Sequence, residues 1–278
     1  MPHGVDARMH GALTMLRRSP ERTGVLTDFD GTLAELVDDP AAARPLPGSV
    51  DVLGRLVRRY GLVGVVSGRP VSFLADHLRV SGLWISGLYG LEAMVDGEIV
   101  EVAEAAPWRE VVRAAVVEAA GALPSLLVED KGMSMTVHFR TTPGRERDAR
   151  SWAERMASTS GLVVREAKAS IELHPPVVAD KGSVIETKVH AHGGLDTVCF
   201  LGDDRGDLSA FGALARLRGN GMQVVRVGVA TPETPDALLA QADVVVDGPE
   251  GALAFLTELL VSSTLSQASH GHGAEHMR

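Results

Sequence analysis

Two acidic segments of the 278-residue chain have the residue types and spacing needed to bind a hard cation. The first is Asp28-Phe-Asp-Gly-Thr-Leu33, at the end of an apolar run. Asp28 and Asp30 are two residues apart, so on an extended chain their carboxylates point to the same side. Gly31 permits a sharp turn and a close approach of the backbone to a ligand. By itself the segment is also consistent with an ordinary Asp-Gly turn.

The second acidic segment, Gly202-Asp-Asp-Arg-Gly-Asp207, follows another apolar run and contributes Asp203, Asp204 and Asp207. Five carboxylates gathered in one crevice repel one another unless a cation neutralises them. Oxygen ligands of this kind select Mg²⁺ over metals that prefer softer ligands. Asp207 could instead cap a helix that starts near Leu208. For Asp203 we favour the metal.

Two further segments could bind an anion. Ser67-Gly-Arg69 ends a second apolar run and offers a hydroxyl and free backbone N–H groups. Asp180-Lys-Gly182 opens a helical stretch, which places Lys181 near a helix N-terminus. A cation and a helix dipole together favour a phosphate group. Taken singly, Ser67 could form a simple turn and Lys181 could be a solvated surface lysine.

The elements that must position these residues alternate between strands and helices. Apolar runs bounded by turn residues predict buried strands at 25–29, 62–66, 83–85, 198–201, 224–229 and 244–246. Helical spacing predicts helices over 49–59, 71–78, 208–217, 235–241 and 249–260, with Ser49 as the N-cap of the first. This alternation indicates an α/β fold with a doubly wound, Rossmann-like parallel sheet. Ligands bind at the carboxyl ends of such strands, where the motifs lie.

The middle of the chain has a different pattern. Residues 133–140 alternate between apolar and polar types, as in a strand with one solvated face. Two further strands are expected at 162–164 and 171–173, and helices over 107–120 and 144–157. We therefore expect an α+β segment, residues 105–178, inserted into a core made of 1–104 and 179–262. The polar tail, 263–278, is expected to be disordered, although its three histidines could bind a metal.

Composition excludes several functional classes. A net charge of -9 argues against a nucleic-acid binder, which needs a basic face. The single cysteine, Cys199, cannot form an intramolecular disulfide and fits a reducing compartment. No apolar run approaches the ~20 residues of a membrane span, and the N-terminal stretch lacks the apolar region of a signal peptide. We expect a cytoplasmic protein that contacts neither nucleic acid nor membrane, with a monomer as the default.

The order of the motifs, Asp-x-Asp-Gly-Thr, then Ser, Lys and Gly-Asp-Asp-x-x-Asp, resembles the haloacid dehalogenase-like phosphatase superfamily. Further segments narrow the resemblance to the trehalose-6-phosphate phosphatases. They are Asp28–Glu35 with Asp38-Asp-Pro40 and Arg44–Pro47, Val66–Arg69, Gly87–Glu92, Val128–Lys131 with His138-Phe-Arg140, and Ile171–Pro175 ahead of Lys181-Gly182. The likeness covers most of the chain, the inserted segment included.

This resemblance implies a Mg²⁺-dependent phosphatase that hydrolyses trehalose 6-phosphate through an aspartyl-phosphate. It makes Asp28 the nucleophile and Asp30 the acid and then the base. It implies a metal held by the Asp28 carboxylate, the Asp30 backbone carbonyl and Asp203, with Asp204 and Asp207 orienting the metal's waters. The inserted segment becomes a cap that closes over the sugar. The residues implied to contact substrate are Thr32, Ser67, Arg69 and Lys181 from the core, and Glu129, Lys131, Arg140 and Glu172 from the cap.

The sequence departs from the family pattern at four positions. Gly206 and Leu208 replace a usual Thr and Glu, Tyr89 stands where a histidine is usual, and His174 stands where an arginine is usual. These changes leave the catalytic acids in place and concern sugar recognition. The same chemistry on a trehalose-like pseudo-disaccharide phosphate, for example of the validoxylamine type, therefore stays an alternative. A sugar phosphomutase and a non-catalytic sugar-phosphate sensor are weaker ones.

Overall fold

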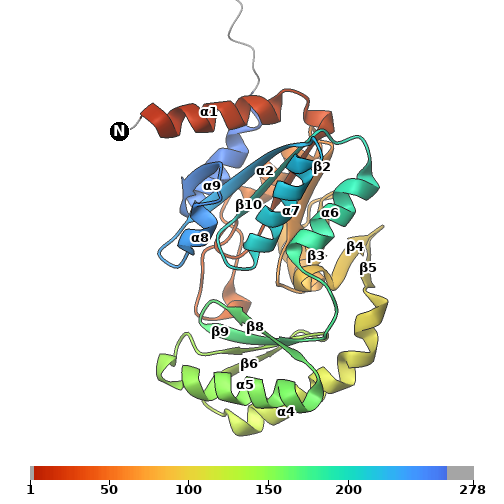
Figure 1. Cartoon of the computed structure of the whole chain (residues 1–278), viewed down its shortest axis with the longest axis vertical. Coiled ribbons are helices and arrows are strands. Elements are labelled where there is room, and N and C mark those ends of the chain that lie inside the picture. Colours follow the sequence, from red (N-terminus) through yellow and green to blue (C-terminus); the bar gives the residue numbers. More distant parts are fainter. Residues whose placement is uncertain (1–2, 262–278) are drawn as a thin grey trace, which may run out of the picture.

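The computed structural model describes residues 3–261, which form a larger and a smaller α/β unit stacked along the long axis of the molecule (Figure 1). The predicted disordered tail and its histidines lie outside the described residues. Within 3–261, no helix combines the length and the apolar character needed to cross a membrane.

The larger unit is built on an eight-stranded sheet with the order β12-β11-β10-β1-β2-β3-β4-β5. Its six parallel strands are β1 (Thr23–Thr27), β2 (Leu62–Val66), β3 (Trp84–Gly87), β10 (Thr197–Gly202), β11 (Gln223–Ala230) and β12 (Val244–Asp247). β4 (Glu92–Val95) and β5 (Glu98–Glu101) extend one edge as an antiparallel hairpin. From β1 the strand order runs outward through β2 on one side, and from β10 it runs outward through β11 on the other. The neighbours β1 and β10 therefore flank the point where a doubly wound sheet forms its ligand crevice.

Helices cover both faces of this sheet because side chains alternate along the central strands. Val25 and Cys199 face one layer, whereas Leu26 and Phe200 face the other. The first layer contains α1 (His3–Arg17), α2 (Ser49–Val57), α3 (Val71–Leu78) and α9 (Gly248–Glu258). The second contains α6 (Lys181–His192), α7 (Asp207–Gly219) and the short α8 (Asp236–Leu239). Strands apolar on both sides are typical of a parallel sheet buried between helices.

The smaller unit is an antiparallel sheet covered by two helices on one face. Its strands are β6 (Leu127–Asp130), β7 (Met135–His138), β8 (Val163–Ala167) and β9 (Ser170–His174), in the order β6-β7-β9-β8. The helices are α4 (Arg109–Ala122) and α5 (Glu146–Ser160). Val137, Ile171 and Leu173 pack under them with Trp152. The alternate residues of β7 and β9 point to the opposite face, toward the larger unit (Figure 1).

The prediction of a doubly wound α/β fold is confirmed, and several local expectations need correction. Ser49 is not the N-cap of α2: Gly48 occupies that place with φ +91°, and the buried Ser49 hydroxyl has no hydrogen-bond partner. β1 ends at Thr27, so Asp28 lies just beyond the strand rather than inside it. α1, β6 and the β4–β5 hairpin were not predicted from the sequence pattern. Every residue of β5 is exposed, so this segment lacks the longer apolar run from which the buried strands were predicted.

The contact between α6 and α7 depends on Gly182, and this yields a testable prediction. A Cβ at Gly182 would lie 2.3 Å from the backbone oxygen of Ser209. We expect Gly182→Ala to lower the free energy of unfolding by about 1–3 kcal/mol, because backbone must shift to admit the methyl group. Urea denaturation followed by circular dichroism measures this change.

The matched control is Gly212→Ala in α7, where the nearest atom to a new Cβ is the flexible Arg216 Nη1, at 3.5 Å. Alanine favours the helix, so this variant should gain up to about 1 kcal/mol. Equal stabilities for the two variants would contradict the close packing of α6 on α7.

Candidate active site

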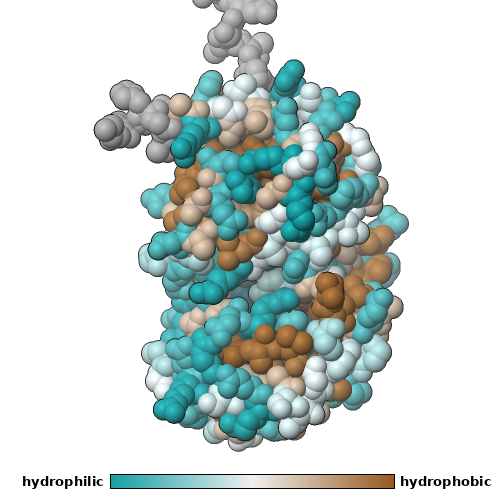
Figure 2. All heavy atoms as spheres, viewed as in Figure 1, coloured by the Kyte–Doolittle hydropathy of each residue, from teal (hydrophilic) through white to brown (hydrophobic). Residues whose placement is uncertain are grey.

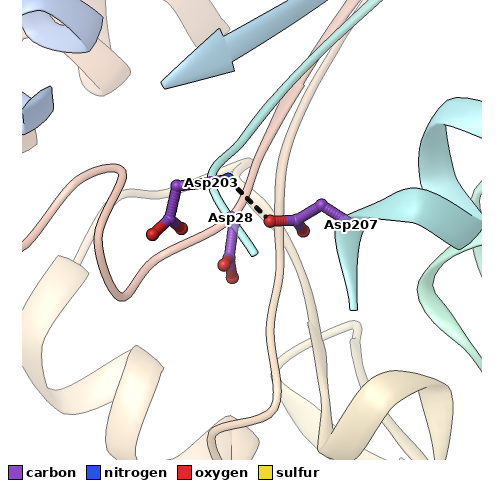
Figure 3. A group of neighbouring side chains, drawn as sticks. All are labelled: Asp28, Asp203 and Asp207. Atoms are coloured by element: carbon purple, nitrogen blue, oxygen red, sulfur yellow. Dashed lines mark hydrogen bonds between the residues drawn. The ribbon is translucent and has the colours of Figure 1, made fainter. Parts of the chain in front are cut away.

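Three buried carboxylates converge at the carboxyl ends of β1 and β10. Because these strands are paired in parallel, the loops after them emerge side by side. Asp28, Asp203 and Asp207 each place one carboxylate oxygen within 4.8 Å of the others. Figure 3 shows Asp28 lying between the other two, with the Asp203 backbone N–H donating to Asp207 Oδ2 at 2.8 Å. The two acidic segments of the sequence therefore form one cluster.

Gly31 and Thr32 bring the first loop against Asp203. Gly31 has φ +76°, and a Cβ there would lie 2.0 Å from Asp203 Oδ2, so any side chain would displace this carboxylate. The Thr32 hydroxyl donates to Asp203 Oδ1 at 3.3 Å. Thr32 is fully buried and does not line the pocket described below. Its side chain thus contacts Asp203, whereas the resemblance implied that Thr32 contacts substrate.

Lys181 is a fully buried cation at the centre of the site. Its Nζ lies 2.8 Å from Asp28 Oδ1 and 2.7 Å from Asp207 Oδ1. It is the first residue of α6, which Asp180 caps by accepting from the Ser183 N–H at 2.7 Å. Burial opposes its charge, yet Asp207 and Asp28 hold the pKa of Lys181 well above its ordinary value. Lys181 therefore stays protonated and balances part of the negative charge.

The pKa values of the buried acids are raised. Burial raises the pKa of Asp28 well above its usual range, and the neighbouring acids add to this rise while Lys181 opposes it. Burial likewise raises the pKa of Asp203 to about 7 and raises that of Asp207. The two lysines therefore compensate the ionised forms of these side chains only in part.

The local charge balance fits a divalent cation. The carboxylates of the cluster and its neighbour Asp204 outnumber the two lysine ammonium groups that contact them, Lys181 and Lys168, by two. Buried charges require a partner of opposite sign. The donor set consists of oxygen atoms, which suits hard ions such as Mg²⁺. The cluster can thus hold a cation beside Asp28.

Asp30 and Arg69 form a two-pronged ion pair next to this cluster. Arg69 donates from Nε to Asp30 Oδ2 and from Nη2 to Asp30 Oδ1, both at 2.7 Å, and from Nη1 to the Pro40 carbonyl at 2.7 Å. Its guanidinium stacks on Phe73 at 4.7 Å. Ser67 is nearly fully buried, and its hydroxyl accepts from the Arg69 N–H at 3.3 Å. Arg69 therefore fixes the direction of the Asp30 carboxylate.

A cavity of about 130 Å³ lies between the two units, with Asp28 in its wall. The larger unit contributes Asp28, Asp30, Ser67, Arg69, Lys181 and Asp204 to its lining, and the smaller unit contributes Glu129, Lys131, Arg140 and Glu172. Asp203 and Asp207 lie behind this wall. Apart from Thr32 and these two acids, every residue that the resemblance implies for catalysis, metal binding or substrate binding lines this one cavity.

The four residues from the smaller unit are already paired. Lys131 Nζ lies 3.4 Å from Glu172 Oε2 and 3.3 Å from the Gly68 carbonyl oxygen. Glu129 Oε2 is 2.8 Å from His138 Nε2. Although burial opposes ionisation, His138 and Lys131 lower the pKa of Glu129 to about 2. This wall therefore offers fixed donors and an acceptor that stays ionised at neutral pH.

Comparison with known proteins gives the family. The family model described as Trehalose-phosphatase matches residues 26–242. The chain belongs to this family. A trehalose-phosphate phosphatase from Mycolicibacterium paratuberculosis is 33% identical over 268 residues, covering 93% of this chain and 66% of that protein. One from Mycobacterium leprae is 34% identical over 215 residues, covering 72% and 50% respectively. The chain thus spans at most about two thirds of the length of these relatives.

Solved structures show the same fold. The C-terminal domain of the Candida albicans trehalose-6-phosphate phosphatase is 23% identical, with a TM-score of 0.76 over 91% of this chain and 98% of that one. A haloacid dehalogenase-like hydrolase from Bacteroides thetaiotaomicron is 16% identical, with a TM-score of 0.59 over 84% and 98%. The resemblance inferred from the motifs is therefore confirmed at the level of family and fold.

The residues that depart from the family pattern lie in different places, some at the cavity and some away from it. Tyr89 lines the cavity, in a backbone conformation with φ +57°, and Arg165 stacks on its ring at 4.2 Å. A Cβ at Gly206 would come within 3.2 Å of the Tyr89 ring, so the residue at 206 limits the space for the ring. His174 is buried outside the lining, with Nδ1 2.8 Å from the Pro175 carbonyl oxygen. Tyr89, not His174, is the departure that faces the cavity.

Lys168 is a site residue that sequence reasoning missed. It lies in the two-residue turn between β8 and β9, and its ammonium pairs with Asp203 Oδ2 in the larger unit. A lysine in a tight turn has the pattern of a solvated surface residue. The sequence of the neighbouring strands gave no signal for the contact between Lys168 and Asp203, because this contact forms only when the two units meet.

The raised pKa of Asp28 predicts that the metal-free protein is stabilised by Asp28→Asn. An unfolded aspartate ionises near about pH 3.9, whereas folded Asp28 holds its proton to higher pH, so its contribution to stability falls as pH rises. We expect the variant to melt at least about 3 °C above the wild type at pH 8 in EDTA, with a smaller gap at pH 5. Calorimetry at both pH values measures the gap.

Asp30→Asn serves as the comparison variant. Asp30 is partly exposed and held by Arg69, so removing its charge should give no increase in melting temperature at either pH. A less stable Asp28→Asn protein at pH 8 would show that Lys181 compensates Asp28 fully.

Proposed function

We propose that this protein hydrolyses trehalose 6-phosphate to trehalose and phosphate, as a phosphoric monoester hydrolase. The supporting observation is a buried carboxylate, Asp28, paired with a buried lysine at the floor of a polar cavity. Its family membership and its relatives' names point to the same reaction. A carboxylate is an effective nucleophile toward phosphorus only where positive charge offsets that of the phosphate, and Lys181 supplies part of it.

In the proposed reaction two displacements occur at phosphorus. An Asp28 oxygen forms a bond to phosphorus while the bond from phosphorus to the sugar oxygen breaks. Asp30, which must be protonated at this stage and so give up at least one of its two bonds from Arg69, donates its proton to the sugar oxygen. Asp30 then takes a proton from water as the water oxygen bonds to phosphorus and the Asp28–phosphorus bond breaks. Both residues return to their starting states. Lys181 and Ser67 bind the non-bridging oxygens throughout.

We propose Mg²⁺ as the metal, held by the Asp28 carboxylate, the Asp30 backbone carbonyl and Asp203. When bound, it supplies positive charge that offsets the charge on the phosphate and on the acid cluster. Asp207 fits a supporting role, because one of its oxygens binds Lys181 and the other accepts from the N–H groups of Asp203 and Asp204. Asp204 lines the cavity, where it can orient a metal-bound water.

We propose that residues 105–178 act as a cap over the core, 1–104 and 179–262. The cavity of about 130 Å³ is smaller than the roughly 300–1,000 Å³ of typical ligand sites, so the cap must swing away to admit a disaccharide. Sugar hydroxyls need both donors and acceptors. In the proposal Glu129, Lys131, Arg140 and Glu172 provide them, exchanging their present ion pairs for the sugar.

On the face in Figure 2 hydrophilic side chains separate the apolar patches. We propose a cytoplasmic monomer whose partner is the small-molecule substrate, with no nucleic acid or membrane involved. Sedimentation equilibrium checks the monomer.

The first test is phosphate release from trehalose 6-phosphate, with glucose 6-phosphate and a pseudo-disaccharide phosphate as comparison substrates. We expect trehalose 6-phosphate to have the highest kcat/KM, release to stop in EDTA, and Asp28→Asn to lower kcat at least about 1,000-fold. Unaltered turnover in that variant would refute the nucleophile. A higher kcat/KM for the pseudo-disaccharide would transfer the proposal to that substrate, with Tyr89 as the cavity residue to examine.

The second test concerns the cap. We expect Glu129→Gln to reduce the preference for trehalose 6-phosphate over glucose 6-phosphate about 10–100-fold, chiefly through KM, because an ionised acceptor for a hydroxyl is lost. With a pKa of about 2, Glu129 is ionised from pH 5 to 9, so the loss should not vary with pH in that range. Glu98→Gln, on exposed β5, should leave the preference unchanged. An equal effect of both variants would contradict the assignment.

A further inference from the structure

The ion pair between Lys168 and Asp203 joins the two units at the acid cluster. Lys168 reaches from the β8–β9 turn of the smaller unit, and its side chain is 15% exposed, whereas that of Asp203 is fully buried. The other Asp203 oxygen accepts from Thr32. Both carboxylate oxygens are thus already occupied by groups of this chain, and one of them by a cation.

Lys168 differs from the other cations that link the units. Lys131 donates to the Gly68 carbonyl, Arg165 donates to the Ala179 carbonyl, and Arg140 pairs with Glu233. None of these three partners belongs to the acid cluster. Lys168, by contrast, contacts a carboxylate of the acid cluster, Asp203, whose side chain is fully buried.

Lys168 also lies between two cavities. Ala167, Lys168 and Asp204 line both the main cavity and a second one of about 220 Å³, which Arg205, Glu233 and Pro235 complete. Displacing the Lys168 side chain would therefore open a path from the second cavity to the acid cluster. The turn that carries it includes Ala169 with φ +46°, a conformation that costs free energy for a residue other than glycine.

We propose that Lys168 is a built-in competitor of the divalent metal at Asp203, so that seating of the β8–β9 turn on the larger unit and metal binding oppose each other. The inference rests on the metal site of the proposed function. An ammonium group and a metal ion placed beside the same buried carboxylate repel each other as like charges, so each weakens the binding of the other. Because coupling between two binding events is reciprocal, removing the ammonium strengthens metal binding and adding metal releases the turn.

Competition at Asp203 has a consequence for the cap. The closed cavity is too small for a disaccharide phosphate, so one closing contact must be given up before the substrate enters. Metal binding removes the contact that the β8–β9 turn makes with the cluster. The metal-loaded protein is then the form whose cap opens more readily.

The first experiment measures metal affinity without substrate. Calorimetric titration with MnCl₂ or MgCl₂ should show at least tenfold tighter binding to Lys168→Met than to the wild type. Arg145→Met is the matched control, because it removes a cation of the smaller unit whose ion-pair partner, Asp148, lies in the same unit, so it alters neither the junction nor the acid cluster. Its affinity should stay within about twofold of wild type. Unchanged or weaker binding in Lys168→Met, with binding to wild type present, would overturn the inference.

The second experiment uses the wild-type chain, so it does not depend on the folding of a variant. Hydrogen exchange of amides in residues 165–170 should speed up on addition of MgCl₂, while α2 and α9 stay unchanged. Unchanged or slower exchange in the turn would contradict the competition. If neither protein binds either metal, the metal site fails and the inference with it, whereas phosphate release tests the phosphatase itself.

Discussion

The structure of the site depends on one buried cation, Lys181. Its ammonium binds Asp28 at the end of β1 and Asp207 at the start of α7, so it ties together two loops and the N-terminus of α6. Lys181 also opposes the rise that burial causes in the pKa of Asp28. The other Asp207 oxygen accepts a hydrogen bond from the Asp203 N–H and so orients the backbone of the second acidic loop. Gly182 allows α6 to approach α7 closely enough for these contacts.

The junction between the two units is held by charge, whereas each unit is held by its own apolar core. Alternation along β7 and β9 sends Val137 and Ile171 under the helices and Thr136 and Glu172 to the cavity. Contacts across the junction are ion pairs and bonds to carbonyl groups, with a small apolar cluster around Leu88 and Met133 near the connecting segments. Polar interfaces of this kind are the ones that permit domain movement. The arrangement suits a site that must close over a polar ligand and release it.

Local patterns predicted most of the central sheet because its strands are apolar on both sides and are flanked by turn residues. β2 and α3 have the predicted bounds, 62–66 and 71–78. Prediction failed where burial is one-sided or absent, as in the β4–β5 hairpin, whose second strand is fully exposed. It also failed for Ser49, because the choice between Gly48 and Ser49 as N-cap depends on a left-handed backbone, which the sequence pattern did not show.

The sequence by itself determined the acids, the candidate lysine, the strands that carry the acids, and the family, since these depend on residue type and spacing along the chain. The tertiary structure decided the partners. It directed Thr32 to Asp203, paired Arg69 with Asp30, brought Tyr89 but not His174 to the cavity, and placed Lys168 on the acid cluster. Thr32, Arg69 and Lys168 each contact a residue more than 20 positions away along the chain. The folding of the larger unit sets the first two contacts, and the packing of the two units sets the third.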